Sequence, residues 1–170
     1  MKLQDFLSDK RSSLIKKWSK VLIESYPLGS HNFFVREKDI FANPVGNTIS
    51  REVKNLYDAL ITGGDAEKIA SSLDGIIRIR AVQDFEPSQA ISFVLRLKDL
   101  IRKELGKACA DKGLSDELLQ FEKKIDDTLL QAFDIYSQCR QQIYEIRVHE
   151  VKNHLGKLLE RANLTCEIPE

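Results

Sequence analysis

The sequence feature that most constrains the fold is a stretch near the C-terminus that contains no glycine and no proline. It runs from Ser115 to Leu155, and its apolar side chains recur with helical spacing. About 40 helical residues span roughly 60 Å at a rise of about 1.5 Å per residue. A domain of roughly a hundred residues has a radius of gyration of only about 13 Å. We therefore expect one long helix that extends beyond the domain to which it belongs.

The apolar positions of this helix change frame part of the way along. One heptad frame, expected to face the core of the helix's own domain, holds Leu129, Phe133, Tyr136 and Ile143. A second frame, shifted by one position, forms a seam made of Tyr144, Val148, Val151, Leu155 and Leu158. We predict a helical bundle over residues 1–138, an extension of its last helix over 139–162, and a flexible tail over 163–170.

The other segments of the chain are also helical by their apolar spacing, and none alternates apolar and polar residues long enough to predict a strand. Asn43 is a suitable N-cap before Pro44, whose fixed backbone angle fits the first helical turn. Asp65 can cap a further helix, and Pro87 can open another. The predicted fold class is all-α.

The composition limits the partners and the location of the protein. Of the 170 residues, 42% are apolar, which suits one compact core with an appendage. Lys+Arg and Asp+Glu each number 26 and are interspersed, so the field that attracts nucleic acid is missing. No apolar stretch approaches the roughly 20 residues of a membrane span, and the N-terminal residues lack the apolar block of a signal peptide. We expect a soluble, cytoplasmic protein with no nucleic-acid or membrane partner.

Three stretches together resemble a known family. They are FANPVG at 41–46, IIRIRAVQDFEPSQA at 76–90 and DIYSQCRQQIYEIRVHEVKN at 134–153. Over about residues 8–153 the chain is similar to the N-terminal domain of RsbR/RsbRD-type RsbT co-antagonists, the stressosome proteins. The resemblance implies a globin-like helical bundle without haem, which dimerises and lies upstream of an output module. In the family that module is commonly a STAS domain joined through the long last helix.

The printed sequence ends at Glu170, and we expect it to hold no STAS domain. A sensor domain that stands alone would signal in trans, through a separate protein that docks on the exposed helix. We expect no enzyme, because the resemblance supplies no catalytic residue for this chain and no phosphate-binding loop or nucleophile motif is present. Two rival functions stay open: a structural adaptor without ligand sensing, and a carrier of a small molecule, haem or a metal.

Arg78, Arg80 and Asp84 are the candidate ligand-binding residues. They lie where an otherwise apolar helix runs into a loop. A guanidinium group beside apolar surface can bind a carboxylate or a phosphate, because its donors match the oxygens of both groups. The alternative is an internal ion pair between Arg80 and Asp84 that fixes the loop.

Cofactor and metal sites have little support in the sequence. Haem iron in globins is held by a histidine from a core helix, whereas His31 is expected in a loop and His149 and His154 on the extension. Glu145 and His149 have the i, i+4 spacing of two metal ligands, but no third ligand follows from the sequence. We predict no cofactor and no metal.

The three cysteines, Cys109, Cys139 and Cys166, are far apart and form no C-x-x-C pair, so we predict free thiols. Cys139 would be a candidate redox switch if Arg140 lowered the pKa of its thiol. A buried, inert thiol is the simpler interpretation.

The seam of the extension carries the strongest functional signal. In a parallel dimer, Arg140 would face Glu145 of the second chain favourably, whereas Arg147 would face Lys152 unfavourably. Two heptads with such mixed charges make a weak coiled coil. Three interpretations remain open: a homodimer interface, a docking site for another protein, and a helix that folds back on its own bundle. Our leading hypothesis is a non-enzymatic sensor domain that forms a homodimer and acts on a separate protein.

Overall fold

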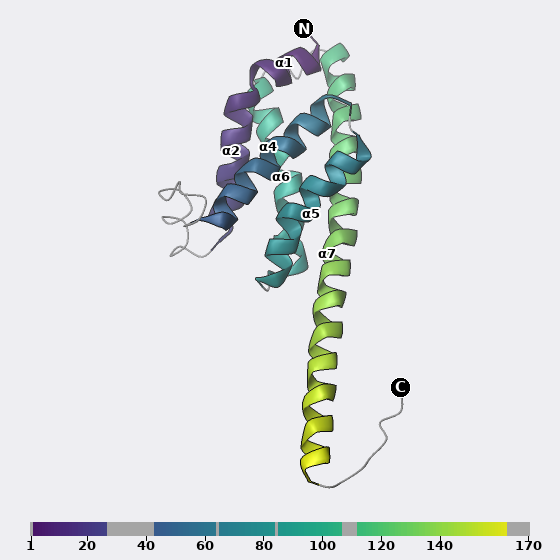
Figure 1. Cartoon of the computed structure of the whole chain (residues 1–170). Helices are drawn as coiled ribbons and strands as arrows, with labels where there is room; N and C mark the ends of the chain where they lie inside the picture. Colours follow the sequence, from purple (N-terminus) through teal and green to yellow (C-terminus); the bar gives the residue numbers. More distant parts are fainter. Residues whose placement is uncertain (1, 27–42, 64, 84, 107–111, 163–170) are drawn as a thin grey trace.

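The computed structural model describes residues 2–26, 43–63, 65–83, 85–106 and 112–162, and all regular structure within these ranges is α-helical. The helices are α1 (Leu3–Asp9), α2 (Arg11–Glu24), α4 (Pro44–Ile61), α5 (Ala66–Val82), α6 (Pro87–Leu105) and α7 (Lys112–Arg161). Figure 1 shows the other helices gathered around the first half of α7, while its second half extends away from them alone. The predicted all-α fold with a long, projecting C-terminal helix is confirmed. Within the described ranges, no helix combines the length and the apolar character needed to cross a membrane.

Helices α4, α5 and α6 begin at the residues that the sequence predicted. The Asn43 side chain accepts a hydrogen bond from the Gly46 amide at 2.9 Å, and the Asp65 side chain accepts one from the Glu67 amide at 3.1 Å. Proline occupies the first turn of both α4 and α6. A Cβ atom at Gly46 would lie only 2.4 Å from Asn43 Nδ2, so the cap of α4 also requires a glycine at that position.

The core lies between α2, α4, α5, α6 and the first half of α7. Helices α5 and α6 pack against α7, α4 packs against α5, and α2 packs against α4 and α6. Trp18 of α2 is fully buried, and its indole N–H donates to the Phe93 carbonyl of α6 at 2.7 Å. Tyr57 of α4 donates its hydroxyl to the Leu7 carbonyl of α1 at 2.9 Å, which attaches the N-terminal helix. The large buried aromatics thus keep their polar atoms paired.

One stripe of α7 faces this core. It is spaced by three and four residues and includes Phe121, Ile125, Ala132, Tyr136 and Cys139, with Ile143 half-buried one turn further. The prediction that Phe133 faces the core is wrong. Its side chain is 50% exposed, because the buried stripe passes through the neighbouring Ala132 and leaves Phe133 on the outer side of the helix.

Candidate functional site

Arg80 is the most unusual residue of the bundle, because its charged side chain is completely buried. It follows Leu73, Ile76 and Ile77 at helical spacing on the buried face of α5, a position where an apolar residue is expected. Its guanidinium carbon lies 4.2 Å from the ring centroid of Phe85 and 5.3 Å from that of Tyr26. Arg80 thus lies in a low-dielectric, aromatic environment.

The polar atoms of Arg80 are only partly satisfied. Its Nη2 atom donates to the Gln89 carbonyl at 2.8 Å. Among the described residues, Nε and Nη1 have no hydrogen-bond partner and no carboxylate pairs with the group. Burial lowers the pKa of Arg80, but arginine stays protonated in proteins. The bundle therefore contains a buried positive charge without a counter-ion in the described part of the chain.

The structure places Arg78 and Arg80 on different sides of α5. Arg78 lies on the exposed side of α5, where it forms two hydrogen bonds of 2.8 and 3.1 Å with the Asp74 carboxylate one turn earlier. This pairing raises the pKa of Arg78. Asp84 lies outside the described residues, so the predicted pair between Arg80 and Asp84 stays a prediction. Of the two candidates that the structure describes, Arg80 is the one that is buried and keeps donors without an acceptor.

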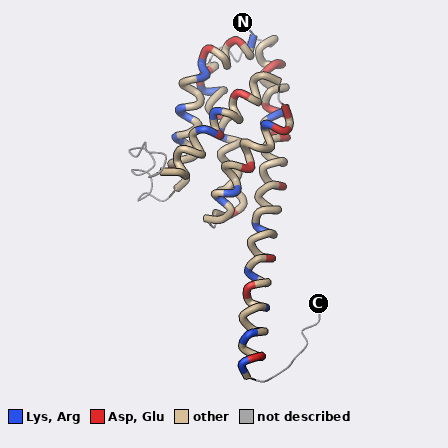
Figure 2. Tube along the Cα trace, in the orientation of Figure 1, with Lys and Arg blue, Asp and Glu red and all other residues tan. Residues whose placement is uncertain are grey.

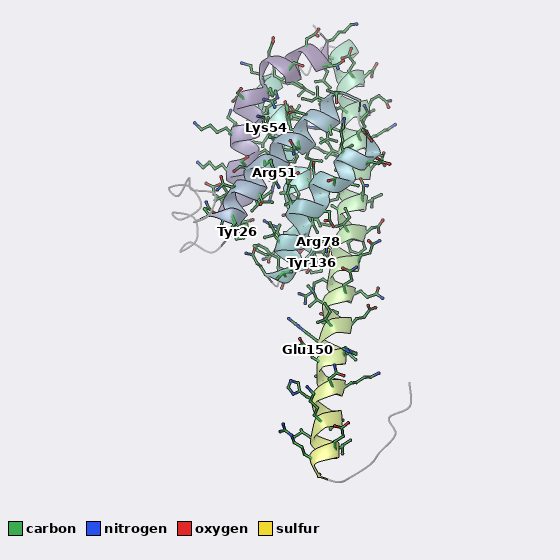
Figure 3. All side chains as sticks on the ribbon, in the orientation of Figure 1. Tyr26, Arg51, Lys54, Arg78, Tyr136 and Glu150 are labelled. Carbon is green, nitrogen blue, oxygen red and sulfur yellow. The ribbon has the colours of Figure 1, made fainter. Side chains whose placement is uncertain are left out.

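The corner between α5 and α6, next to Arg80, is fastened to α7. Tyr136 donates its hydroxyl to the Phe85 carbonyl, and Arg140 Nη1 donates to the Ala81 carbonyl at 2.9 Å. The Phe85 amide donates in turn to the Arg80 carbonyl at 3.3 Å. Figure 3 places Tyr26 and Tyr136 at the end of the bundle from which α7 projects. The buried arginine is therefore connected to α7 where that helix leaves its own domain.

The predicted seam lies on the projecting half of α7, and the structure leaves it uncovered. Between 49% and 66% of each of its side chains is exposed: Tyr144, Val148, Val151, Leu155 and Leu158. No residue from Tyr144 to Ala162 is buried. The extension does not fold back on its own bundle within the described residues, and this excludes one of the three interpretations of the seam for this state of the chain.

Two further exposed apolar residues of α7 lie beside the bundle, on the same side of the helix as the seam but separated from it by polar residues. Leu130 is 65% exposed and Phe133 is 50% exposed. Five helical turns, about 18 residues at 3.6 residues per turn, separate Leu130 from Val148 and Phe133 from Val151. These four residues therefore point in the same direction. We call Leu130, Phe133 and the five seam residues the outer strip.

Arg140 interrupts the outer strip between Phe133 and Tyr144, and charged residues of both signs surround the rest of it. Figure 2 shows Lys or Arg and Asp or Glu interspersed along the projecting half of α7 and over the bundle. Arg140, expected to face a second chain, instead hydrogen-bonds to its own bundle, and its guanidinium lies 5.1 Å from the ring centroid of Tyr144. Glu145 accepts a hydrogen bond from Gln141 of the same helix at 2.9 Å. The predicted pair between Arg140 and Glu145 of another chain therefore has to compete with contacts inside one chain.

The histidines and Cys139 are the other candidate groups for metal binding or redox chemistry. His149 and His154 lie on the exposed extension, and His31 lies outside the described residues. The described residues contain no cluster of three or more His, Cys, Asp or Glu that could hold a metal ion. Burial raises the pKa of the Cys139 thiol, in the direction opposite to that of a reactive cysteine.

Sequence reasoning missed several residues that contribute to these two sites. Tyr26, Gln89 and Tyr136 contact or fasten the Arg80 corner through tertiary contacts that no local pattern predicts. Leu130 and Phe133 could have been assigned to the strip from their five-turn spacing to the seam.

Comparisons with known proteins agree with this arrangement. Residues 12–151 match the family described as the RsbT co-antagonist protein rsbRD N-terminal domain. An uncharacterized protein of Archaeoglobus fulgidus is 27% identical over 141 residues, which cover 82% of this chain and 83% of that protein. No solved structure matches the chain. The family is a regulatory one of stressosome type, and its match covers both the Arg80 corner and the first half of the seam. The chain belongs to the RsbT co-antagonist protein rsbRD N-terminal domain family.

Proposed function

We propose that this chain is a non-enzymatic sensor domain that forms a homodimer through the outer strip of α7 and passes a change of conformation in trans to a separate protein. The observation that carries the proposal is the exposed seam on a helix that has left its own bundle. A row of five apolar side chains that are each about half exposed or more is typical of an interaction site.

A second copy of the chain is the occupant that the strip fits best. The strip is straight and narrow, with the three- and four-residue spacing of a two-helix interface. Leu130 and Phe133 lie beyond Arg140 on the same side of the helix, so two copies would meet along both the extensions and the bundles. These two residues supply contact area that two heptads with mixed charges lack.

A signalling role requires two arrangements of α7 that a ligand or partner binds unequally, because equal binding shifts no population. The contacts of Tyr136 and Arg140 with the α5–α6 corner provide a place where such a change could begin. In a dimer, a small rotation of α7 at that corner would alter the pairing of both extensions. A separate protein that recognises the paired extensions would detect the difference.

The proposal is tested by the mass of the purified protein in solution. The double variant Val151→Asp with Leu155→Asp places two charges in the strip and should convert a dimer into a monomer by multi-angle light scattering. Ile146→Asp is the matched control, because Ile146 is 59% exposed but lies half a turn away from Val148 on the opposite side of the helix. A dimer that survives the double variant, or that Ile146→Asp also breaks, would move the interface elsewhere.

Action in trans is tested separately by using the three proteins as bait in an extract of the source cells. A partner that reads the paired extensions should be retained by the wild type and by Ile146→Asp but lost from the double variant. Equal retention by all three would argue against a role for the strip in output.

A further inference from the structure

We propose that Arg80 is the binding group for a small oxoanion, a carboxylate or a phosphate, and that this anion is the signal to which the domain responds. The first part stands on the geometry of the bundle alone. The second part rests on the proposed function, since it assumes that α7 conveys a change of conformation.

The buried charge of Arg80 is costly in free energy unless it is neutralised. An ion in a low-dielectric interior requires a counter-ion and hydrogen bonds to replace the water that it has lost. Arg80 is fully buried, yet among the described residues it donates a well-formed hydrogen bond only to the Gln89 carbonyl, and the neutral Tyr26 hydroxyl is the one polar side chain beside it. Cation–π contacts with Phe85 and Tyr26 compensate only in part. An anion that accepts from Nη1, or from Nε together with the second hydrogen of Nη2, would supply a missing acceptor.

The chemical class of the ligand follows from the donors. Guanidinium N–H groups in a dry site form short, charge-assisted hydrogen bonds with carboxylate and phosphate oxygens. The guanidinium carbon lies close to two aromatic rings and the side chain is fully buried. A small anion would reach the donors with less displacement of these neighbours than a large one.

Because the guanidinium is covered, the anion cannot bind without displacing a neighbour. Tyr26 and Phe85 cover it, with ring centroids 5.0 Å apart, and the Phe85 carbonyl is the atom that Tyr136 of α7 binds. A ligand that moves Phe85 therefore disturbs a contact of α7. Arg140 holds the same corner one helical turn further along and contacts Tyr144, the first residue of the seam. Binding and the position of the extension are linked through these contacts.

The test of binding uses sodium phosphate and sodium acetate as probes, with sodium chloride at equal ionic strength as the reference. At an anion concentration of about 100 times Kd, the Tm of the wild type should rise by about 5–10 °C. Phosphate also stabilises proteins by exclusion from their surface, so the comparison with variants decides the result. Arg80→Met should retain only this non-specific rise, whereas Arg78→Met, which alters an exposed arginine two residues away, should respond as the wild type does. Isothermal titration of the wild type then shows whether phosphate or acetate is the better ligand.

Three outcomes would overturn the inference. The first is a wild-type Tm that changes no more in phosphate or acetate than in chloride. The second is an Arg80→Met protein that responds as strongly as the wild type. The third is an anion response that appears only in Asp84→Asn, since this would show that a carboxylate of the chain itself neutralises Arg80. If Arg80→Met does not fold, the wild type and Asp84→Asn still decide the question.

The link to signalling is tested by measuring the dissociation constant of the dimer with and without the better anion. A change of threefold or more in the wild type that is absent in Arg80→Met supports the link. Anion binding without such a change would contradict the link alone, and a missing dimer would contradict the proposed function while leaving the binding result intact.

Discussion

The two halves of α7 belong to one uninterrupted helix but have opposite surroundings. From Phe121 to Cys139, one stripe of side chains is buried against α5 and α6. From Tyr144 to Arg161, every side chain is at least partly exposed, although apolar residues recur just as regularly. Regular apolar spacing therefore predicts that a helix has a face suited to packing, but it does not say which molecule packs there. Helices of the same chain pack on the first half, and we propose that a second copy of the chain packs on the second half.

The charged residues of the two halves differ in the same way. In the first half, Glu122 receives two hydrogen bonds from Arg102 of α6 at 2.5 and 2.7 Å, and its own side chain is nearly buried. In the second half, Glu145 contacts only a neighbour on its own helix among the contacts that the structure describes. Charges thus help to position the first half of α7 within the bundle, whereas they contribute little to the folding of the second.

The largest difference between the halves is expected in the free energy of unfolding. It should appear when a buried side chain of the first half is shortened and the result is compared with shortening an exposed side chain of the second half. Ile125→Ala should lower the free energy of unfolding by about 2–5 kcal/mol, because it leaves a cavity at a fully buried site. Val151→Ala should change it by no more than about 0.5 kcal/mol, since Val151 is 66% exposed. Urea unfolding at low protein concentration measures both. Equal losses would mean that the extension folds against its own bundle.

A smaller effect is expected for the ion pair of the first half. Arg102→Ala should lower the free energy of unfolding by about 1–2 kcal/mol, a value reduced because the arginine is itself largely exposed. Arg102 lowers the pKa of Glu122 in the folded state relative to the unfolded chain. The stability from the pair is therefore present above the unfolded pKa and is lost as the pH falls through the folded value.

Measured against pH, the wild type and Arg102→Ala should accordingly differ at neutral pH and converge in acid. Arg147→Ala, in the exposed second half, is the matched control and should follow the wild type throughout. A difference between wild type and Arg102→Ala that is the same at every pH would mean that the arginine acts through packing alone.

The sequence predicted the parts of this structure that depend on local rules. The starts of α4 and α5 follow from Asn43 and Asp65, whose side chains accept hydrogen bonds from free amides of the first turn. The starts of α4 and α6 also follow from proline, which has no amide hydrogen that would need a partner there. The start of α7 was less predictable, since the helix begins at Lys112 and includes Gly113, whereas the glycine-free stretch in the sequence begins only at Ser115. A glycine weakens a helix only slightly, and the length of α7 outweighs it.

The sites were predicted less completely than the helices, because they depend on contacts between distant residues. Arg78 and Arg80 look equivalent in sequence, yet a separation of two residues places them on different sides of α5. Phe133 was assigned to the core because it fits a heptad with Leu129 and Tyr136. In the structure Ala132 is buried instead, on the side of α7 that packs against α5 and α6. Burial of this kind can be derived only from the packed structure.

Replacing outer-strip residues on the bundle half tests whether that half also joins the dimer. Leu130→Ser and Phe133→Ser should each weaken dimerisation by about 1 kcal/mol, or roughly fivefold in the dissociation constant, because each removes a large apolar contact from an interface. The stability of the isolated domain should hardly change, since both residues are at least half exposed. Analytical ultracentrifugation measures the first quantity and urea unfolding the second. Unchanged dimerisation would confine the interface to the extension.

The smallest effect is expected at Gly156, the glycine within the projecting half of α7. No atom lies within 4 Å of a Cβ built at this position, so an alanine fits without a clash. Gly156→Ala should stabilise the extension by about 0.5–1 kcal/mol, because alanine loses less backbone entropy in a helix than glycine does. A stiffer extension loses less entropy when two copies pair, so the dimer should become up to about fivefold tighter while the bundle unfolds at the same urea concentration. Circular dichroism and ultracentrifugation of the same samples separate these effects. Gly156 lies beside the strip rather than on it, and a weaker dimer would therefore mean that the two helices approach each other at this glycine, along a different face from the one assigned here.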